Sequence, residues 1–160
     1  MLGWGWAALR SGLHEVGQPI AGQTILVSGA AGSAGAHVAQ LGKTHGCRVV
    51  GVAGGQEKCR YFTKLGFDAV IDYKSGDLER SVAATCPERV DVFFHNIGGE
   101  TLNVALASIN HGARVVLCGR IFDINSDAAG QRAQNYFALA IKRPAWRVLP
   151  VWTIERKSLK

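Results

Sequence analysis

Short apolar runs alternate with longer amphipathic stretches along the chain, and they predict alternating strands and helices. The apolar runs predict strands at 24–28, 47–53, 69–71, 90–94, 113–117 and 146–152, the last weakened by Pro150. The stretches between them predict helices at 4–15, 33–45, 57–65, 78–85, 102–109 and 130–141. Because the strands are apolar on both faces, they are typical of a parallel sheet covered by helices on both sides. We therefore predict an α/β fold, a Rossmann-type doubly wound sheet of about six strands in the order 3-2-1-4-5-6.

The composition is that of a globular domain. The 160 residues are 48% hydrophobic and 19% charged, which is enough for a sizeable core. The net charge is +6, but residues 142–160 carry six Lys and Arg against Glu155 alone, so the remainder is nearly neutral. This distribution argues against a nucleic-acid-binding face. Residues 16–42 have no Asp, Glu, Lys or Arg, but they are too rich in Gly, Gln and Ser for a membrane span, and no signal peptide is apparent.

The four cysteines are widely spaced along the chain. They form no CxxC pair, and no histidine lies at zinc-finger spacing from a cysteine pair, so we expect no metal site. A chain of this size needs no disulfides, and three of the four cysteines fall in or beside predicted core elements. These observations favour a reducing compartment, and we predict a cytoplasmic protein. The cysteines are Cys47, Cys59, Cys86 and Cys118.

A run of small residues follows the first predicted strand and precedes a helix. The dinucleotide pattern G-x-G-x-x-G is matched here by Ala30-x-Gly32-x-x-Gly35. Small residues at these positions let the backbone turn sharply and approach a pyrophosphate, which the N–H groups of the helix start can bind. The alternative is that the small residues only allow close packing of helix and strand. We favour nucleotide binding because the turn lies within a βαβ unit.

The residues after the second predicted strand favour NADP over NAD. An NAD site of this type has an acidic residue there, which holds the ribose 2′-hydroxyl. This chain instead has no acidic residue between Ala53 and Gln56, and Lys58 and Arg60 follow. A nearby cation suits a 2′-phosphate, although both side chains could also be solvated charges on a helix. We favour a phosphate role, more strongly for Lys58.

Several further motifs, in order along the chain, resemble the medium-chain dehydrogenase/reductase superfamily. Within it, the chain is most similar to the zinc-independent prostaglandin reductase and 2-alkenal reductase group. The resemblance covers roughly residues 16–125 and is weaker beyond. It is carried by the runs 30–35 (AAGSAG), 46–51 (GCRVVG), 54–59 (GGQEKC), 65–68 (LGFD), 72–74 (DYK), 96–100 (NIGGE) and 118–119 (CG).

The resemblance implies a role for each cofactor residue by its position. The pyrophosphate would lie against the start of the first helix, the 2′-phosphate against the end of the second strand, and the nicotinamide at the ends of the fourth and fifth strands. Other interpretations stay open, because Tyr73 could be a rim residue, Asn96 a turn residue and Cys118 a small core residue. In that order the implied residues are Gly32, Ser33, Ala34 and Gly35; Gly54, Lys58 and Tyr73; and Asn96, Cys118 and Gly119.

The chain departs from the resembled group in two respects. Ile124 stands where the group commonly has a tyrosine near the substrate, and isoleucine cannot donate a proton. The resemblance also implies a protein of two domains. We expect only the cofactor domain here, over 17–152. A linker helix over 1–16 and a basic tail over 153–160 would flank it, and the preceding catalytic barrel-like domain would be absent. The resemblance also implies a homodimer paired through the sixth strands, although Pro144 precedes the strand and Pro150 removes one of its hydrogen-bond donors.

The favoured function is an NADPH-binding domain of an oxidoreductase. In the complete protein it would transfer hydride to the C=C bond of α,β-unsaturated ketones or aldehydes, the fragment alone being inactive or weakly active. We identify no catalytic residue, and His95 could at most tune the nicotinamide site. The alternative is a non-catalytic NADPH-sensing or interaction module. A short-chain reductase is disfavoured because Tyr61 is followed by Lys64, one residue too soon, and a methyltransferase by the missing acid.

Overall fold

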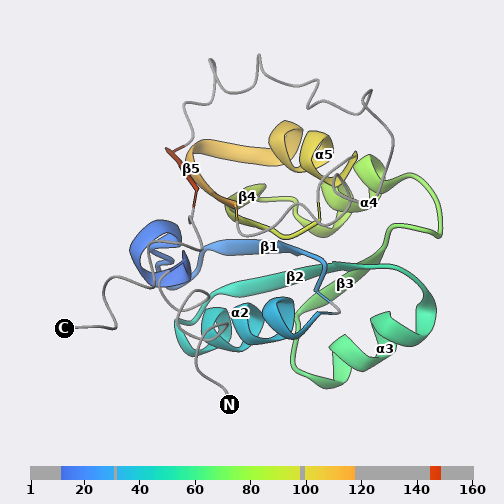
Figure 1. Cartoon of the computed structure of the whole chain (residues 1–160). Coiled ribbons are helices and arrows are strands. Elements are labelled where there is room, and N and C mark those ends of the chain that lie inside the picture. Colours follow the sequence, from blue (N-terminus) through green and yellow to red (C-terminus); the bar gives the residue numbers. More distant parts are fainter. Residues whose placement is uncertain (1–11, 31, 98–99, 118–144, 149–160) are drawn as a thin grey trace.

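The sheet forms the centre of the molecule, and its strand order is the predicted one. The computed structural model describes residues 12–30, 32–97, 100–117 and 145–148. Six parallel strands pair in the order β3-β2-β1-β4-β5-β6 (Figure 1). The chain order therefore reverses between β1 and β4, and the Rossmann-type prediction is confirmed. The strands are β1 Thr24–Ser28, β2 Arg48–Ala53, β3 Ala69–Asp72, β4 Val90–His95, β5 Ile109–Leu117 and β6 Ala145–Val148.

Helices cover both faces of this sheet. One face carries α2 Ser33–Thr44 and α3 Gln56–Lys64, and the other carries α4 Leu78–Thr85 and α5 Glu100–Ser108 (Figure 1). Successive residues of a strand point to opposite faces, so β1 contributes to two cores. Ile25 and Val27 share one core with Val38 of α2, whereas Leu26 shares the other with Val82 of α4. Two cores on one sheet explain why residues 25–27 of β1 are apolar at successive positions.

The boundary between α5 and β5 differs from the prediction. The pattern predicts a helix to residue 109 and a strand from 113, but β5 is continuous from Ile109. Its pairing with β4 shifts register between Val90 and Val92. Gly112, inside this segment, has a φ of 72°, which glycine adopts without steric cost. The extra residues therefore form an irregularity within the strand rather than a separate loop.

Some predicted segments lie outside the described residues. These are most of the helix at 4–15, the whole helix at 130–141 and the second half of the sixth strand. β6 is an edge strand of the sheet, and the homodimer through it stays a prediction.

Cys47, Cys59 and Cys86 are free thiols in the structure. Within the described ranges, no helix combines the length and apolar character needed to cross a membrane.

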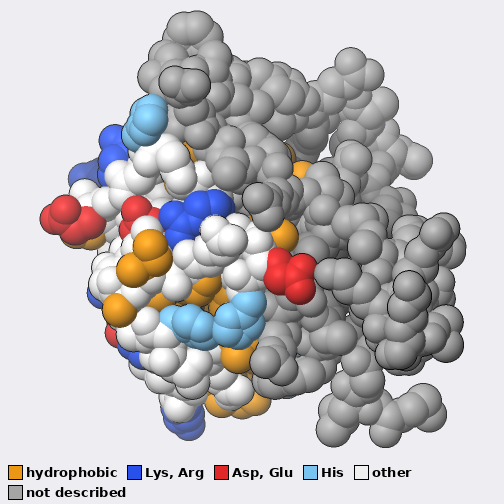
Figure 2. All heavy atoms as spheres, turned by 90° about the vertical axis from the view of Figure 1, so that its left-hand side faces the viewer, with side chains coloured by type: hydrophobic (Ala, Val, Ile, Leu, Met, Phe, Trp, Pro, Cys, Tyr) orange, Lys and Arg blue, Asp and Glu red, His pale blue; other side chains and the backbone are white. Residues whose placement is uncertain are grey.

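A short π-helix, η1 Gly12–Gly17, packs against β4 and β5 at the end of the sheet where β1 begins (Figure 1). Leu13 of this helix is fully buried. Arg114 of β5 donates a hydrogen bond from Nε to the carbonyl oxygen of Gly17 at 2.7 Å, which ties the end of η1 to the sheet. Figure 2 shows the surface on the left-hand side of Figure 1. On its described part, acidic, basic and histidine side chains are interspersed, and neither sign of charge forms a patch.

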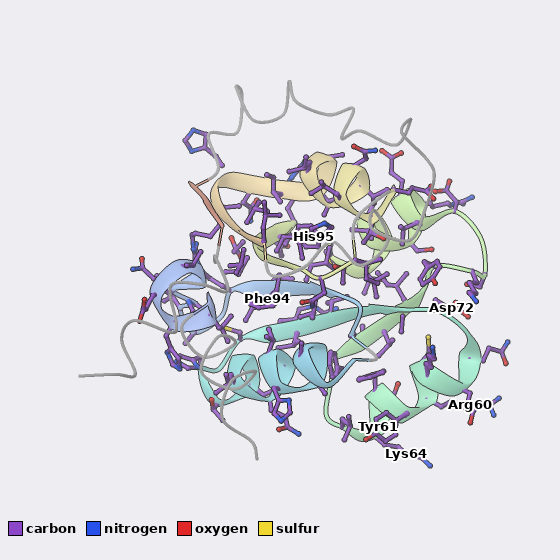
Figure 3. The ribbon with its side chains drawn as sticks, viewed as in Figure 1. Arg60, Tyr61, Lys64, Asp72, Phe94 and His95 are labelled. Carbon is purple, nitrogen blue, oxygen red and sulfur yellow. The ribbon has the colours of Figure 1, made fainter. Side chains whose placement is uncertain are left out.

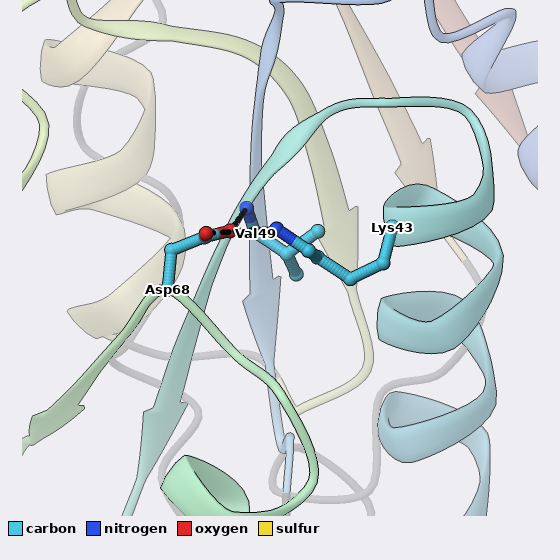
Figure 4. Close-up of polar contacts among 3 residues, drawn as sticks. All are labelled: Lys43, Val49 and Asp68. Atoms are coloured by element: carbon cyan, nitrogen blue, oxygen red, sulfur yellow. Dashed lines mark hydrogen bonds and ion pairs between the residues drawn. The ribbon is translucent and has the colours of Figure 1, made fainter.

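Asp68 links the loop before β3 to both β2 and α2 (Figure 4). Its Oδ2 accepts the backbone N–H of Val49 at 2.6 Å, and its Oδ1 lies 2.8 Å from Nζ of Lys43. Burial raises the pKa of the Asp68 carboxyl, but the hydrogen bonds from Lys43 and Val49 and the positive charges of Lys43 and Arg48 together leave that pKa below its ordinary value. A depressed carboxyl pKa contributes stability above the unfolded-state pKa, and this contribution is lost as the pH falls through the folded-state pKa.

We expect Asp68→Ala to lower the free energy of unfolding at neutral pH by roughly 1–3 kcal/mol, because the Val49 N–H loses its acceptor. The difference from the unsubstituted chain should shrink in acid, where Asp68 is protonated. Urea unfolding at neutral and acidic pH measures both effects. Lys43→Ala is the control, with an expected loss of about 0–1 kcal/mol, since it removes only a partly exposed ion pair. Equal losses in the two variants would contradict the importance of the Val49 hydrogen bond.

Candidate functional site

The glycine turn after β1 leads directly into the start of α2. Gly32 is the N-cap residue, and Ser33 and Ala34 begin the helix. No described side chain caps this end, and the first turn holds no acidic residue. The first N–H groups of a helix have no partner within it and carry partial positive charge. The start of α2 can therefore bind an anionic group through its backbone.

Gly35 is the point at which α2 approaches the turn most closely. A Cβ at this position would lie 2.6 Å from Cα of Ala30 and 2.6 Å from the carbonyl oxygen of Gly29. Both neighbours are backbone atoms, so only glycine fits without moving the chain. Gly32 is less restricted, because its Cβ would lie 3.5 Å from the same carbonyl oxygen. The close packing of α2 holds its first N–H groups beside the end of β1.

A second group of predicted residues lies where β2 and β3 end. The backbone N–H of Tyr73 donates to the carbonyl oxygen of Ala53 at 3.1 Å, so the two chain segments run side by side. The Tyr73 ring covers Gly54, where a Cβ would lie 2.7 Å from Cε1 and 2.8 Å from Oη. The Tyr73 residue remains 43% exposed. The structure thus brings Gly54 and Tyr73 together, with the phenol at the surface.

Asp72 belongs to this second group, and no role was predicted for it beyond its place in the run 72–74. Its Oδ1 accepts the backbone N–H of Gly55 at 2.8 Å and that of Lys74 at 3.0 Å. These two hydrogen bonds hold the pKa of the Asp72 carboxyl below its ordinary value. Gly55 is the N-cap residue of α3, so a carboxylate from β3 fixes the start of that helix. The available signal was the acidic residue that ends the third apolar run.

Lys58 lies in the first turn of α3 with an exposed side chain. It therefore stands at the end of α3 that adjoins Gly54 and Tyr73. Lys64 ends the same helix on the far side. Figure 3 shows Lys64 on α3 together with Arg60, and Asp72 where β3 ends. The helix thus offers one lysine near the candidate site and one away from it.

Ser28 and Asn96 connect the ends of β1 and β4, where the strand order reverses. The Asn96 backbone N–H donates to Oγ of Ser28 at 2.9 Å, and Asn96 Nδ2 donates to the Ser28 carbonyl oxygen at 2.8 Å. Ser28 is fully buried and Asn96 is 8% exposed. These two hydrogen bonds place Asn96 at the switch point of the sheet, where ligands of such sheets bind. Sequence reasoning missed Ser28, whose only signal was a hydroxyl at the end of an apolar strand.

His95 lies next to Ser28 in the interior of the protein and is 1% exposed. Its Nδ1 is 3.4 Å from Oγ of Ser28, and its ring lies 5.2 Å from that of Phe93 between centroids. Figure 3 shows His95 and Phe94 among the strands in the interior of the molecule. The histidine therefore supports Ser28 from the core and does not face solvent.

The remaining predicted site residues, Cys118 and Gly119, lie outside the described residues, as does Ile124. Within the described ranges, no group of three or more His, Cys, Asp and Glu side chains is arranged to hold a metal ion. The described chain therefore offers backbone amides and single polar side chains for a ligand. These donors suit an organic anion such as a dinucleotide.

The strand order and the open helix start after β1 define a Rossmann-type α/β domain. The chain belongs to the zinc-binding dehydrogenase family, whose family model matches residues 34–142. This confirms the resemblance to the medium-chain dehydrogenase/reductase superfamily, for the cofactor-binding part.

Two curated relatives and one solved structure illustrate the similarity. The chain is 44% identical over 116 residues to the NADPH-dependent curcumin reductase of Escherichia coli, covering 72% of this chain and 34% of that protein. It is 42% identical over 116 residues to prostaglandin reductase 1 of Oryctolagus cuniculus, covering 72% and 33%. The crystal structure of CurA from Vibrio vulnificus in complex with NADPH superposes with a TM-score of 0.83 at 36% identity, covering 93% of this chain and 45% of that one. The chain thus spans about a third of the length of the curated relatives.

Proposed function

We propose that this chain is the NADPH-binding domain of a zinc-independent oxidoreductase that transfers hydride to the C=C bond of α,β-unsaturated ketones or aldehydes. The observation that carries the proposal is the start of α2, which no described side chain caps and which Gly35 holds against the turn after β1. The names of relatives support the cofactor and the reaction class, since they include an NADPH-dependent curcumin reductase and a prostaglandin reductase.

Each part of NADPH has residues of suitable chemistry in this proposal. The N–H groups at the start of α2, from Ser33 to Gly35, would bind the pyrophosphate. Lys58 and the Tyr73 hydroxyl would hold the 2′-phosphate beside Gly54. Oδ1 of Asn96 would accept a hydrogen bond from the nicotinamide ribose. The bound cofactor supplies the hydride, and the protein supplies position and electrostatics.

The finer parts of the proposal concern zinc, the compartment and the activity of the chain alone. We propose zinc independence because the described residues offer no metal-binding group. We propose a cytoplasmic location because the cysteines of the described core are free thiols. We propose little or no turnover by this chain alone, with Cys118 and Gly119 flanking the nicotinamide and the substrate held by a second domain.

Titration with NADPH and NADH, followed by an enone assay, tests the proposal. We expect calorimetry to detect NADPH binding with NADH much weaker, and the absorbance band of reduced nicotinamide to stay unchanged when a simple enone is added. Absence of NADPH binding would refute the cofactor assignment. Rapid loss of the absorbance band would show that the chain alone is a complete reductase. Binding by a full-length protein that never turns over enones would favour the sensing or interaction module.

A further inference from the structure

A carboxylate stands beside the loop at which the proposed function places a 2′-phosphate. In NAD sites, an acidic residue after the second strand holds the ribose 2′-hydroxyl. Asp72 comes from the neighbouring strand but reaches the same turn, since its Oδ1 lies 2.8 Å from the backbone nitrogen of Gly55. Two like charges close together repel, so this side chain needs an account that is compatible with NADPH.

The partners of Asp72 provide that account. Its Oδ1 accepts hydrogen bonds from Gly55, which follows Gly54, and from Lys74, which follows Tyr73. One oxygen atom thus joins the two chain segments on either side of the contact between Gly54 and the Tyr73 ring. The carboxylate thus binds backbone N–H groups and holds Gly54 and the Tyr73 ring together.

The turn at Gly55 has a backbone conformation that favours glycine. Gly55 has a φ of 95°, and a Cβ at this position would have no neighbour within 4 Å. A side chain at this position would therefore face open space, and the hydrogen bond to Asp72 restrains the Gly55 N–H from the β3 side. Because Gly55 is the N-cap residue of α3, the same bond sets where the first turn of α3, with Lys58, begins.

We infer that Asp72 is a positioning residue for cofactor selection, which holds Tyr73 and Lys58 in place for the 2′-phosphate of NADPH instead of binding the 2′-hydroxyl of NADH. The inference rests on the proposed function. In an NAD site an acidic residue favours NADH by binding its 2′-hydroxyl. Here the acidic residue favours NADPH by holding other residues in place. The hydrogen-bond acceptor at Oδ1 is what matters, and the negative charge is not.

Two substitutions separate the acceptor from the charge. Asp72→Asn keeps an oxygen at Oδ1 and removes the charge, whereas Asp72→Ala removes both. We expect Asp72→Ala to weaken NADPH binding about tenfold, because binding must then order a loosened turn. NADH binding should change little, since NADH has no 2′-phosphate. Asp72→Asn should bind NADPH as well as the unsubstituted chain does. Calorimetry with both cofactors measures these ratios.

Coupling to Lys58 distinguishes positioning from a general loss of structure. If Asp72 acts through Lys58, adding Asp72→Ala to a Lys58→Ala chain should cost clearly less NADPH affinity than Asp72→Ala does alone. Asp77→Ala is the matched control, because Asp77 likewise accepts a backbone N–H, from Arg80 at 3.0 Å, but caps α4. It should leave the preference for NADPH over NADH unchanged.

The outcomes are distinct. Equal NADPH affinity in the unsubstituted chain and Asp72→Ala would overturn the inference and leave the proposed function intact. Equal losses of NADH affinity in Asp72→Ala and Asp72→Asn would overturn it in favour of a direct ribose contact. If the unsubstituted chain binds no NADPH, the proposed function fails and the inference with it. Rescue by Asp72→Asn together with non-additive losses supports the positioning role.

Discussion

Gly35→Ala is expected to abolish measurable NADPH binding and to lower the free energy of unfolding by roughly 1–3 kcal/mol, the usual range for overpacking. The added Cβ would lie 2.6 Å from Cα of Ala30 and from the carbonyl oxygen of Gly29. These are backbone atoms, so relief requires that α2 move away from the end of β1. That movement displaces the N–H groups proposed to bind the pyrophosphate. The gain in helix propensity from alanine, about 1 kcal/mol, opposes the loss but is smaller.

Gly32→Ala separates the close approach from a general effect of alanine in this turn. Its Cβ would lie 3.5 Å from the nearest atom, an ordinary contact, and its φ of −84° suits any residue. Denaturant unfolding should therefore show little change for Gly32→Ala and a clear loss for Gly35→Ala. If Gly35→Ala unfolds and binds like the unsubstituted chain, α2 does not depend on the close approach, and the packing argument is wrong.

The fold was predictable because its signals are local. Strands β1 to β4 each contain an apolar run, α2, α3 and α4 begin after a glycine or after the capping residue Asp77, and the handedness of βαβ units then restricts the strand order. The irregularity in β5 was not predictable, because it depends on how Gly112 turns while pairing with β4 continues. The pattern of hydrophobic residues indicates which positions are buried, but it does not indicate how two neighbouring strands align.

The candidate site was predictable only where one chain segment supplies the residues. The glycine turn after β1 is such a segment, and Gly35 makes the close approach that its pattern indicates. Asp72 was missed because the search for an acidic residue followed the second strand, whereas the carboxylate arrives from the third. Ser28 was missed because a single hydroxyl in an apolar strand shows no partner in the sequence, and its partner Asn96 belongs to β4. Contacts between neighbouring strands need the sheet to be known first.

Lys58→Ala is expected to weaken NADPH binding by about tenfold, near the lower end for a hydrogen bond to a charged group because the side chain is exposed. NADH binding should be unchanged, because its ribose 2′-hydroxyl offers no negative charge. The affinity of the unsubstituted chain for NADPH should also fall with added salt, and that of the variant should fall less. Calorimetry with both cofactors at low and high salt measures these four quantities.

Lys64→Ala is the matched control for Lys58→Ala, since it removes the same charge from the last turn of α3. A loss of NADPH affinity shared by both variants would mean that net charge attracts the cofactor, with no specific phosphate contact. A loss confined to Lys58→Ala, largely restored in Lys58→Arg, would place a cation-dependent contact at the start of α3. Because the turn before Lys58 is held by Asp72 at Gly55, a specific effect of Lys58 also requires that turn to be formed. The selectivity for NADPH should therefore depend on one exposed cation and on the backbone geometry that presents it.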